Sequence, residues 1–126
     1  MFAISVKGVL LTCDGRVVLA LNDRDEWELP GGRMELGESP KNCLAREIEE
    51  ESGIAARVDK PIDSYLFEVI PGRHVFIVTY LCSSDGSFVP RVSQEHKQVG
   101  IFSPEDLPAN LPLGYRRSIE SATRQA

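Results

Sequence analysis

The sequence predicts an α/β domain in which helices cover a mixed β-sheet. Three observations support this prediction. The expected elements follow the order strands, one helix, further strands and a last helix. The chain has 126 residues, of which 42% are hydrophobic, and this is enough for one domain with its own core. No internal repeat, low-complexity segment or Pro/Gly/Ser linker divides the chain, so we expect residues 1–126 to form a single domain.

The expected strands are runs rich in Val, Leu and Ile that are bounded by turn residues. Asp14-Gly15 is a strong hairpin signal between the first two runs. The Pro-Gly-Gly triplet that follows the third run must interrupt regular structure, because proline lacks an amide donor and glycine permits unusual backbone angles. The runs are 3–13 and 16–22, then 27–29 before Pro30-Gly31-Gly32, then 62–70 and 74–82 around Pro71-Gly72-Arg73, and a last one near 98–103.

The main helix is predicted from its end signals. Ser39 is suited to the N-cap, and Pro40 to the first helical position. Good helix formers run from 42 to 51, and Gly53 supplies the C-terminal stop. We also expect a short helix to start at 103–107 and a C-terminal helix over about 113–124.

Charge and composition exclude several classes of protein. The 14 basic and 19 acidic side chains give a net charge of −5, which argues against a binder of polymeric nucleic acid. The apolar N-terminal stretch is too short for a membrane span and lacks the pattern of a secretory signal. The three cysteines (Cys13, Cys43 and Cys82) show no CxxC spacing, and we expect them to be buried and reduced. The sequence therefore favours a cytoplasmic protein without a membrane partner.

The helix over 40–52 carries an unusual concentration of carboxylates. At 3.6 residues per turn, Glu47, Glu50 and Glu51 fall within an arc of about 100°, beside Leu44 and Ile48. These three carboxylates are therefore expected at the boundary between core and solvent. They repel each other, and they crowd the helix end that disfavours negative charge. A hard divalent cation with oxygen ligands would offset this cost, whereas a plain solvated face is the alternative.

The spacing of these residues has a known counterpart. From Gly32 the chain reads Gly, five residues, Glu38, seven residues, and then Arg46-Glu47-Ile48-Glu49-Glu50-Glu51-Ser52-Gly53-Ile54. This pattern over 32–54 resembles the signature of the Nudix hydrolase family, G-x5-E-x7-R-E-U-x-E-E-x-G-U, where U is aliphatic. The resemblance implies an α/β/α sandwich with a mixed sheet. It also implies hydrolysis, with Mg²⁺ or Mn²⁺, of a diphosphate linkage in a nucleoside diphosphate derivative.

The resemblance also assigns roles to residues. It implies that Glu47, Glu50, Glu51 and the main-chain carbonyl of Gly31 are metal ligands. Arg46 would orient these carboxylates, with an i,i+4 surface pair to Glu50 as the alternative. Glu38 would be a supporting group and not a direct ligand.

The general base and the substrate contacts are less closely defined. We favour Glu47 or Glu50 as the base, with Glu95 as the rival in a loop where many family members carry an acidic residue. Arg24 is a candidate phosphate contact, and a surface arginine is the alternative. Trp27 is a candidate for stacking on a base, although packing beside the Pro-Gly-Gly turn is the simpler reading.

The expected substrate is a (deoxy)nucleoside triphosphate, a small-molecule nucleotide. ADP-ribose or another nucleotide sugar, or a dinucleoside polyphosphate, is the main enzymatic alternative; Pro71, 17 residues past Ile54, is a weak indication of the ADP-ribose type. A nucleotide-sensing domain without catalysis is the third reading. It is disfavoured because the motif glutamates are intact. Family members often dimerise, so a homodimer remains open.

Overall fold

The computed structural model describes residues 2–84 and 98–125. Within these residues the sequence forms seven strands and two helices, and the predicted order of elements is confirmed. Their bounds are β1 (Ala3–Leu11), β2 (Val17–Leu21), β3 (Trp27–Glu28), β4 (Gly31–Arg33), α1 (Pro40–Ser52), β5 (Ala56–Ile70), β6 (Arg73–Ser84), β7 (Gln98–Phe102) and α2 (Leu113–Gln125).

The strands form one mixed sheet with β1 at its centre. β1 runs parallel to β6 along its whole length, from Ala3 opposite Val75 to Leu11 opposite Ser83. The other pairings within the described residues are antiparallel: β1 with β2 and β4, β2 with β3 and β7, and β5 with β6. The main path of the sheet therefore runs β3-β2-β1-β6-β5, with β4 beside β1 and β7 beside β2.

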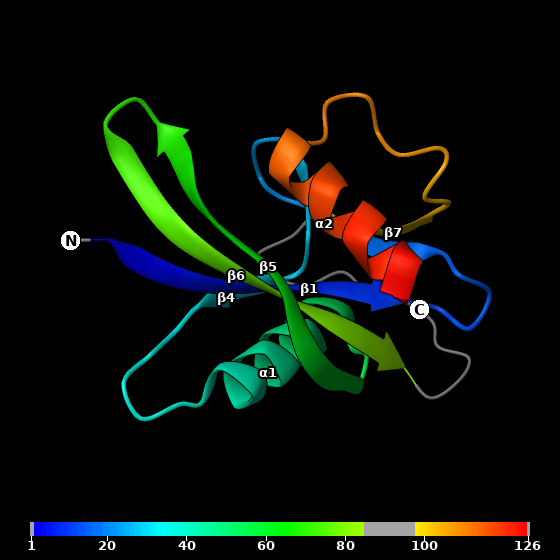
Figure 1. Cartoon of the computed structure of the whole chain (residues 1–126), viewed down its shortest axis with the longest axis horizontal. Helices are drawn as coiled ribbons and strands as arrows, with labels where there is room; N and C mark the ends of the chain where they lie inside the picture. Colours follow the sequence, from blue (N-terminus) through cyan, green and yellow to red (C-terminus); the bar gives the residue numbers. More distant parts are fainter. Residues whose placement is uncertain (1, 85–97, 126) are drawn as a thin grey trace.

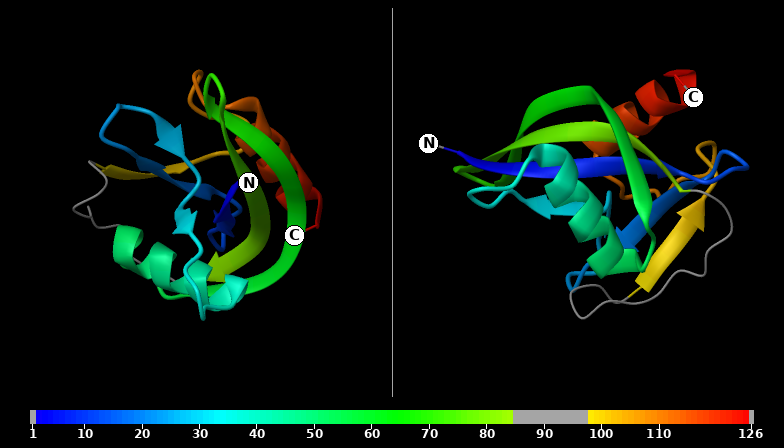
Figure 2. Two further views of the ribbon diagram at one scale, coloured as in Figure 1. Left: turned by 90° about the vertical axis from the view of Figure 1, so that its left-hand side faces the viewer. Right: turned by 90° about the horizontal axis from the view of Figure 1, so that it is seen from below.

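The two helices cover opposite faces of the sheet, as Figures 1 and 2 show. On the α1 face, Val6 and Leu10 of β1 pack with Leu44 and Ile48. On the α2 face, Val9 and Leu11 pack in a second core with Ile119. Alternate residues of β1 thus enter two different cores, as the period of a strand requires. The predicted α/β/α sandwich with a mixed sheet is confirmed.

Two local expectations were wrong. Residues 103–107 form turns and not a helix: the Asp106 N–H donates to the Ser103 carbonyl (2.9 Å), and Pro108 then prevents a helix from continuing. Cys13 is exposed in the β1–β2 turn, whereas Cys43 and Cys82 are buried as expected.

The long β5–β6 hairpin projects beyond the rest of the sheet (Figure 1). Its turn lies at Pro71-Gly72, where Gly72 has a φ of 83°. Along β6, Phe76 is 37% exposed, whereas Tyr80, farther from the turn, is buried. No described helix is both long and apolar enough to cross a membrane.

Candidate active site

Helix α1 holds its acidic residues in fixed positions because both of its ends are capped. The Ser39 side chain accepts a hydrogen bond from the Asn42 N–H (3.2 Å) at the start of the helix. At the other end Gly53 has a φ of 77°, and its N–H donates to the Glu49 carbonyl (2.8 Å). The helix therefore begins and ends where the sequence predicts, and this fixes which way each glutamate points.

Burial of the three clustered glutamates changes stepwise across the arc that they share. Glu51 is 2% exposed, the Glu47 side chain 15% and the Glu50 side chain 57%. Ile48 is fully buried, while Glu49 is exposed. The carboxylates thus extend from the core to the solvent, which agrees with the boundary position expected from helix geometry.

Two glycines allow the backbone of β4 to lie directly on these carboxylates. The Gly31 N–H donates to Glu51 Oε1 (3.1 Å). A Cβ on Gly31, whose φ is 144°, would come within 2.0 Å of the Val6 carbonyl oxygen. A Cβ on Gly32 would come within 2.5 Å of the Glu47 carboxyl carbon. Neither position can hold a larger residue without a shift, so the Pro-Gly-Gly segment is fitted to the acidic helix.

Arg46 connects three of the acidic residues. Its Nε and Nη2 donate to the two carboxylate oxygens of Glu38 at 2.9 and 3.0 Å, a bidentate pair. Its Nη1 contacts Glu47 at 3.2 Å and Glu50 at 3.3 Å. The i,i+4 contact with Glu50 is therefore only one part of a network. The geometry is the one expected of a residue that orients carboxylates.

The network also changes the ionisation of its members. Hydrogen bonds from Arg46, together with its charge, hold the pKa of the Glu38 carboxyl below its usual range. Glu38 in turn is the main cause of a raised pKa at Arg46, followed by its hydrogen bond to Glu50 and the charge of Glu47. Both groups stay charged at neutral pH, so a fixed positive charge stands among the carboxylates.

The chemistry of this cluster fits a divalent metal ion. Its donors are carboxylates beside a main-chain turn, and oxygen ligands of this kind suit hard cations. Gly32 leaves open the space beside Glu47 that a side chain would fill. Within the described residues no three Asp, Glu, His or Cys side chains already converge as a metal cluster, and Arg46 bridges Glu47 and Glu50 instead.

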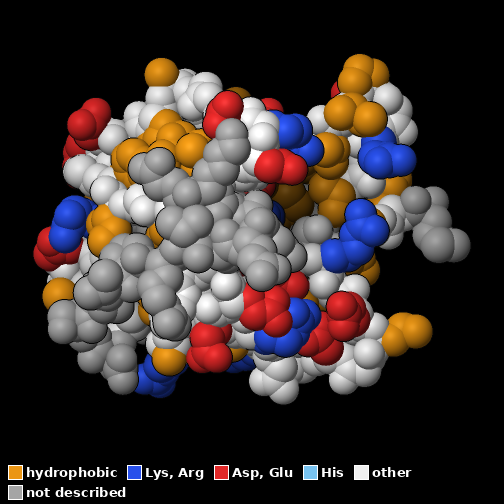
Figure 3. Space-filling model, turned by 180° about the vertical axis from the view of Figure 1, so that it is seen from behind, with side chains coloured by type: hydrophobic (Ala, Val, Ile, Leu, Met, Phe, Trp, Pro, Cys, Tyr) orange, Lys and Arg blue, Asp and Glu red, His pale blue; other side chains and the backbone are white. Residues whose placement is uncertain are grey.

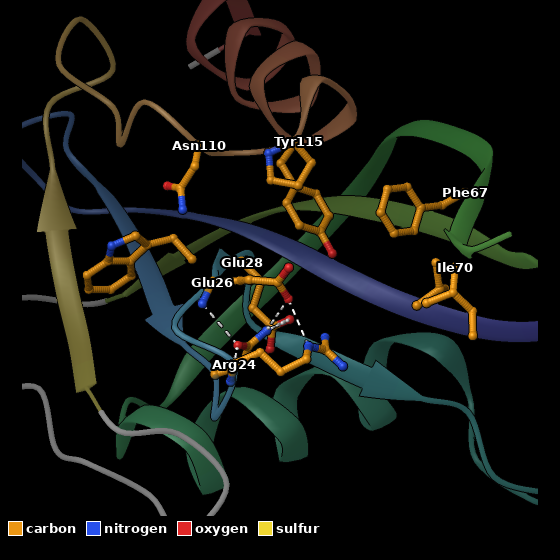
Figure 4. A pocket seen from close by; sticks show the side chains of 11 residues that line it. Arg24, Glu26, Glu28, Phe67, Ile70, Asn110 and Tyr115 are labelled. Atoms are coloured by element: carbon orange, nitrogen blue, oxygen red, sulfur yellow. Dashed lines mark hydrogen bonds and ion pairs between the residues drawn. The ribbon is translucent and has the colours of Figure 1, made fainter.

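A cavity of about 320 Å³ lies on the α2 side of the sheet. Figure 4 shows Tyr115 reaching into it from α2, Phe67 from β5, and Asn110 from the segment before α2, while Glu26 and Glu28 approach from the opposite side. The Tyr115 and Phe67 rings are nearly parallel, with centroids 6.3 Å apart. The cavity thus combines aromatic walls with polar groups. The full lining is Asn22, Arg24, Glu26, Trp27, Glu28, Phe67, Val69, Ile70, Asn110, Pro112 and Tyr115.

The charged surface around this region is mixed. Seen from behind, acidic and basic side chains lie together below a hollow that contains hydrophobic side chains (Figure 3). A cavity with apolar walls and a few polar groups is typical of small-molecule sites.

Comparisons with known proteins identify the family. The family model described as the NUDIX domain matches residues 1–122. A MutT-like protein of Streptomyces ambofaciens is 34% identical over 116 residues, which are 91% of this chain and 73% of that protein. The chain belongs to the Nudix family. The CTP pyrophosphohydrolase of Escherichia coli (strain K12) is 30% identical over 124 residues, 90% of each chain.

The fold comparison agrees with this membership. The crystal structure of a MutT NUDIX hydrolase from Burkholderia pseudomallei matches with a TM-score of 0.82 and 29% identity, covering 96% of this chain and 98% of that one. Nudix pyrophosphohydrolases act on phosphoric anhydrides and generally use divalent metal ions. The acidic helix and the Pro-Gly-Gly segment described above both lie inside the matched Nudix region.

The two residues expected to contact substrate, Arg24 and Trp27, both line the cavity. Arg24 forms an exposed ion pair with Glu26 (2.8 Å). The Trp27 ring packs edge-on against Phe102, with centroids 4.9 Å apart. Trp27 therefore packs against β7 and also borders the cavity. Their roles toward substrate stay predictions.

Other residues in and around the cavity carry weak sequence signals or none. Phe67 lies in a strand of hydrophobic residues, and nothing in that pattern indicates that it borders a cavity. Asn110 and Tyr115 stand in a loop and a helix without any motif. Arg116 of α2 donates to the carbonyls of Leu111 and Pro108 and so holds the segment before the helix. Glu95, the rival for the general base, lies outside the described residues.

Proposed function

We propose that this chain is a Mg²⁺-dependent (or Mn²⁺-dependent) Nudix pyrophosphohydrolase that cleaves the diphosphate linkage of a (deoxy)nucleoside triphosphate. One observation carries the proposal: the segment 28–32 runs from the cavity to the acidic helix. Glu28 lines the cavity, the Gly31 N–H bonds Glu51, and Gly32 lies against Glu47. A nucleoside in the cavity would therefore have its phosphates close to the carboxylates.

The acidic helix supplies the groups that this reaction needs. Water must attack a phosphorus surrounded by negative oxygens, so charge must be neutralised and the water positioned. The proposed metal ligands are Glu47, Glu50, Glu51 and the main-chain carbonyl of Gly31. A bound divalent ion would neutralise phosphate charge and lower the pKa of the attacking water. Arg46 keeps the carboxylates of Glu47 and Glu50 in place for this task.

The base that accepts the proton of the water is proposed to be Glu47 or Glu50. Both carboxylates contact Arg46. Glu47 is the more buried and lies against Gly32, whereas Glu50 is the more accessible to water. Glu95 stays the rival.

A nucleoside triphosphate is favoured over a nucleotide sugar by two observations. The cavity of about 320 Å³ is at the small end for ligand sites and suits a single nucleoside. The Escherichia coli relative that matches along 90% of both chains is named for its action on CTP. The indication for an ADP-ribose type is weakened, because Pro71 lies at the β5–β6 turn, where a proline is common in any fold.

The proposal is tested with a panel of nucleoside triphosphates, ADP-ribose and dinucleoside polyphosphates assayed with Mg²⁺. We expect at least one triphosphate to be cleaved. The Glu50→Gln variant should lose about 10²-fold or more in kcat, because it loses a ligand or the base. Glu49→Gln is the matched control, since Glu49 is exposed one position away, and its rate should equal that of the wild type.

Three outcomes would count against the proposal in different ways. No turnover of any diphosphate compound by folded protein refutes the enzyme, and nucleotide binding without turnover would then favour the sensing domain. Wild-type rates in Glu50→Gln refute the assigned site. Turnover of ADP-ribose alone refutes the substrate class and leaves the family chemistry intact.

A further inference from the structure

The strand β1 carries one buried charge that the proposed chemistry does not use. Lys7 is 8% exposed, lies in the middle of β1 and is the one charged residue of that strand. It shares the strand face of Val9 and Leu11, which pack in the core beneath α2. Lysine is almost never buried without partners, because an unpaired ammonium in the interior costs several kcal/mol, an order of magnitude taken from transfer data.

The partners of Lys7 lie on both halves of the site. Its Nζ donates to the Leu29 carbonyl (3.1 Å), just before the Pro-Gly-Gly segment. Nζ also lies over the Tyr115 ring, 5.9 Å from the ring centre, in a cation–π contact. Burial alone would lower the pKa of Lys7, but Tyr115 and the charges of Glu28, Glu51 and Glu47 outweigh this and raise it.

The two partners of Lys7, Tyr115 and Leu29, belong to different parts of the proposed site. Tyr115 is a wall of the cavity, where it stacks with Phe67. Leu29 begins the segment whose Gly31 is bonded to Glu51, and Gly31 is also paired with Lys7 in the β1–β4 register. A single ammonium group therefore joins the cavity wall to the backbone that supports the acidic helix.

We propose that Lys7 is a positioning residue, which holds the cavity wall and the Pro-Gly-Gly segment at a fixed separation so that a nucleotide seated in the cavity places its diphosphate at the carboxylates. This inference rests on the proposed function. The binding energy of the nucleoside accelerates the reaction only when the reacting phosphate is held at the carboxylates in the correct orientation. Without Lys7 the nucleoside would still bind, but less of its binding free energy would lower the barrier of the chemical step.

The test is the ratio of kcat/KM between the preferred nucleotide and the poorest nucleotide that is still cleaved. In Lys7→Met, a side chain of similar length without charge, kcat for the preferred nucleotide should fall about 10- to 100-fold with KM changed much less. The ratio should fall toward one. If the substitution only reduced the fraction of folded protein, the apparent kcat/KM of every substrate would fall by the same factor. The ratio would then stay unchanged.

Two further variants guard against a Lys7→Met protein that fails to fold. Tyr115→Leu removes the ring over which the Lys7 ammonium lies, and it should lower the same ratio. Thr79→Val is the matched control: Thr79 is buried opposite Lys7 in the β1–β6 register, and its hydroxyl has no hydrogen-bond partner among the described residues. This variant should keep the wild-type ratio.

The inference is overturned if an active wild type discriminates among nucleotides and either Lys7→Met or Tyr115→Leu keeps its full ratio. It is also overturned if the wild type cleaves all nucleotides equally, because the cavity then contributes nothing to rate. A wild type that cleaves no diphosphate compound refutes the proposed function itself, which is a separate result.

Discussion

At the scale of single residues, Arg46 shows how a surface position can matter for geometry more than for stability. Its contacts with Glu38, Glu47 and Glu50 are partly exposed, and exposed ion pairs contribute little to the free energy of unfolding. The bidentate pair with Glu38 nevertheless fixes the direction of the guanidinium. The same guanidinium group also holds the carboxylates of Glu47 and Glu50 in position. Replacing Arg46 by lysine would therefore not be a conservative change.

The three cysteines should differ sharply in their reactivity. Burial raises the pKa of the Cys43 thiol to about 11, with Glu38 adding to the effect, and that of the Cys82 thiol to about 12. Because the thiolate is the reactive form, a raised pKa keeps both thiols protonated and inert at pH 8. We expect a disulfide reagent to modify one thiol per folded chain, Cys13, and all three in denaturant.

The matched control for this prediction is Cys13→Ser, which should leave the folded chain unmodified. Rapid modification of two or more thiols in the folded wild type would contradict the burial of Cys43 or Cys82. The sequence alone does not show which of the three cysteines is exposed. Composition suggests buried cysteines in general, but only the position of Cys13 in a solvent-facing turn makes it the exception.

At the scale of elements, local signals predicted α1 well because its ends are decided by local chemistry. The Ser39 hydroxyl and the left-handed Gly53 act within one turn of the helix, so their effect is visible in the sequence. The segment 103–107 has a similar start signal, but Pro108 and Pro112 prevent a helix from following it. A start signal alone was therefore not sufficient.

Gly32 of β4 allows a substitution that should lower activity with little loss of folding stability. In Gly32→Ala the three atoms nearest to the new Cβ would all belong to the Glu47 carboxylate, at 2.5–2.8 Å. Because that group is the end of a flexible side chain, it can move away at small cost to folding. Glu47 would then leave its place beside β4. We expect kcat to fall about 10-fold or more, by analogy with the loss of supporting contacts at metal sites.

Gly37→Ala is the matched control for this prediction. Gly37 has nothing within 4 Å of a new Cβ, but its φ of 87° is unfavourable for alanine. This variant should lose about 1 kcal/mol of unfolding free energy in urea denaturation and keep its kcat. If Gly32→Ala kept the wild-type rate, the contact between Gly32 and Glu47 would have no bearing on catalysis.

At the scale of the whole molecule, the site combines residues that the sequence keeps far apart. The parallel pairing of β1 with β6 joins positions about 70 residues apart, and no local pattern specifies it. The cavity likewise takes its walls from the β2–β3 loop, β3, β5 and the segment entering α2. The acidic helix could be predicted from a contiguous motif, whereas the cavity and the role of Lys7 depend on this non-local assembly.

The net charge of the chain is concentrated at the candidate active site. Residues 32–54 hold six acidic and three basic side chains, so this segment accounts for −3 of the total of −5. Much of that charge is held on α1, with Glu51 buried. Like charges held together destabilise the folded chain by self-repulsion, and a divalent cation at this place would remove part of that cost. Metal binding should therefore be coupled to the stability of the whole domain.

This coupling can be measured by thermal unfolding with and without Mg²⁺. A ligand that binds only the folded chain stabilises it by about 2.7 kcal/mol at 100 times its Kd. For a domain of this size we expect Tm to rise by roughly 8–13 °C. Glu50→Gln should show a much smaller rise, because one proposed ligand is lost, while Glu49→Gln should match the wild type, because Glu49 is exposed outside the cluster. An equal rise in Glu50→Gln would place the stabilising ion elsewhere on the molecule.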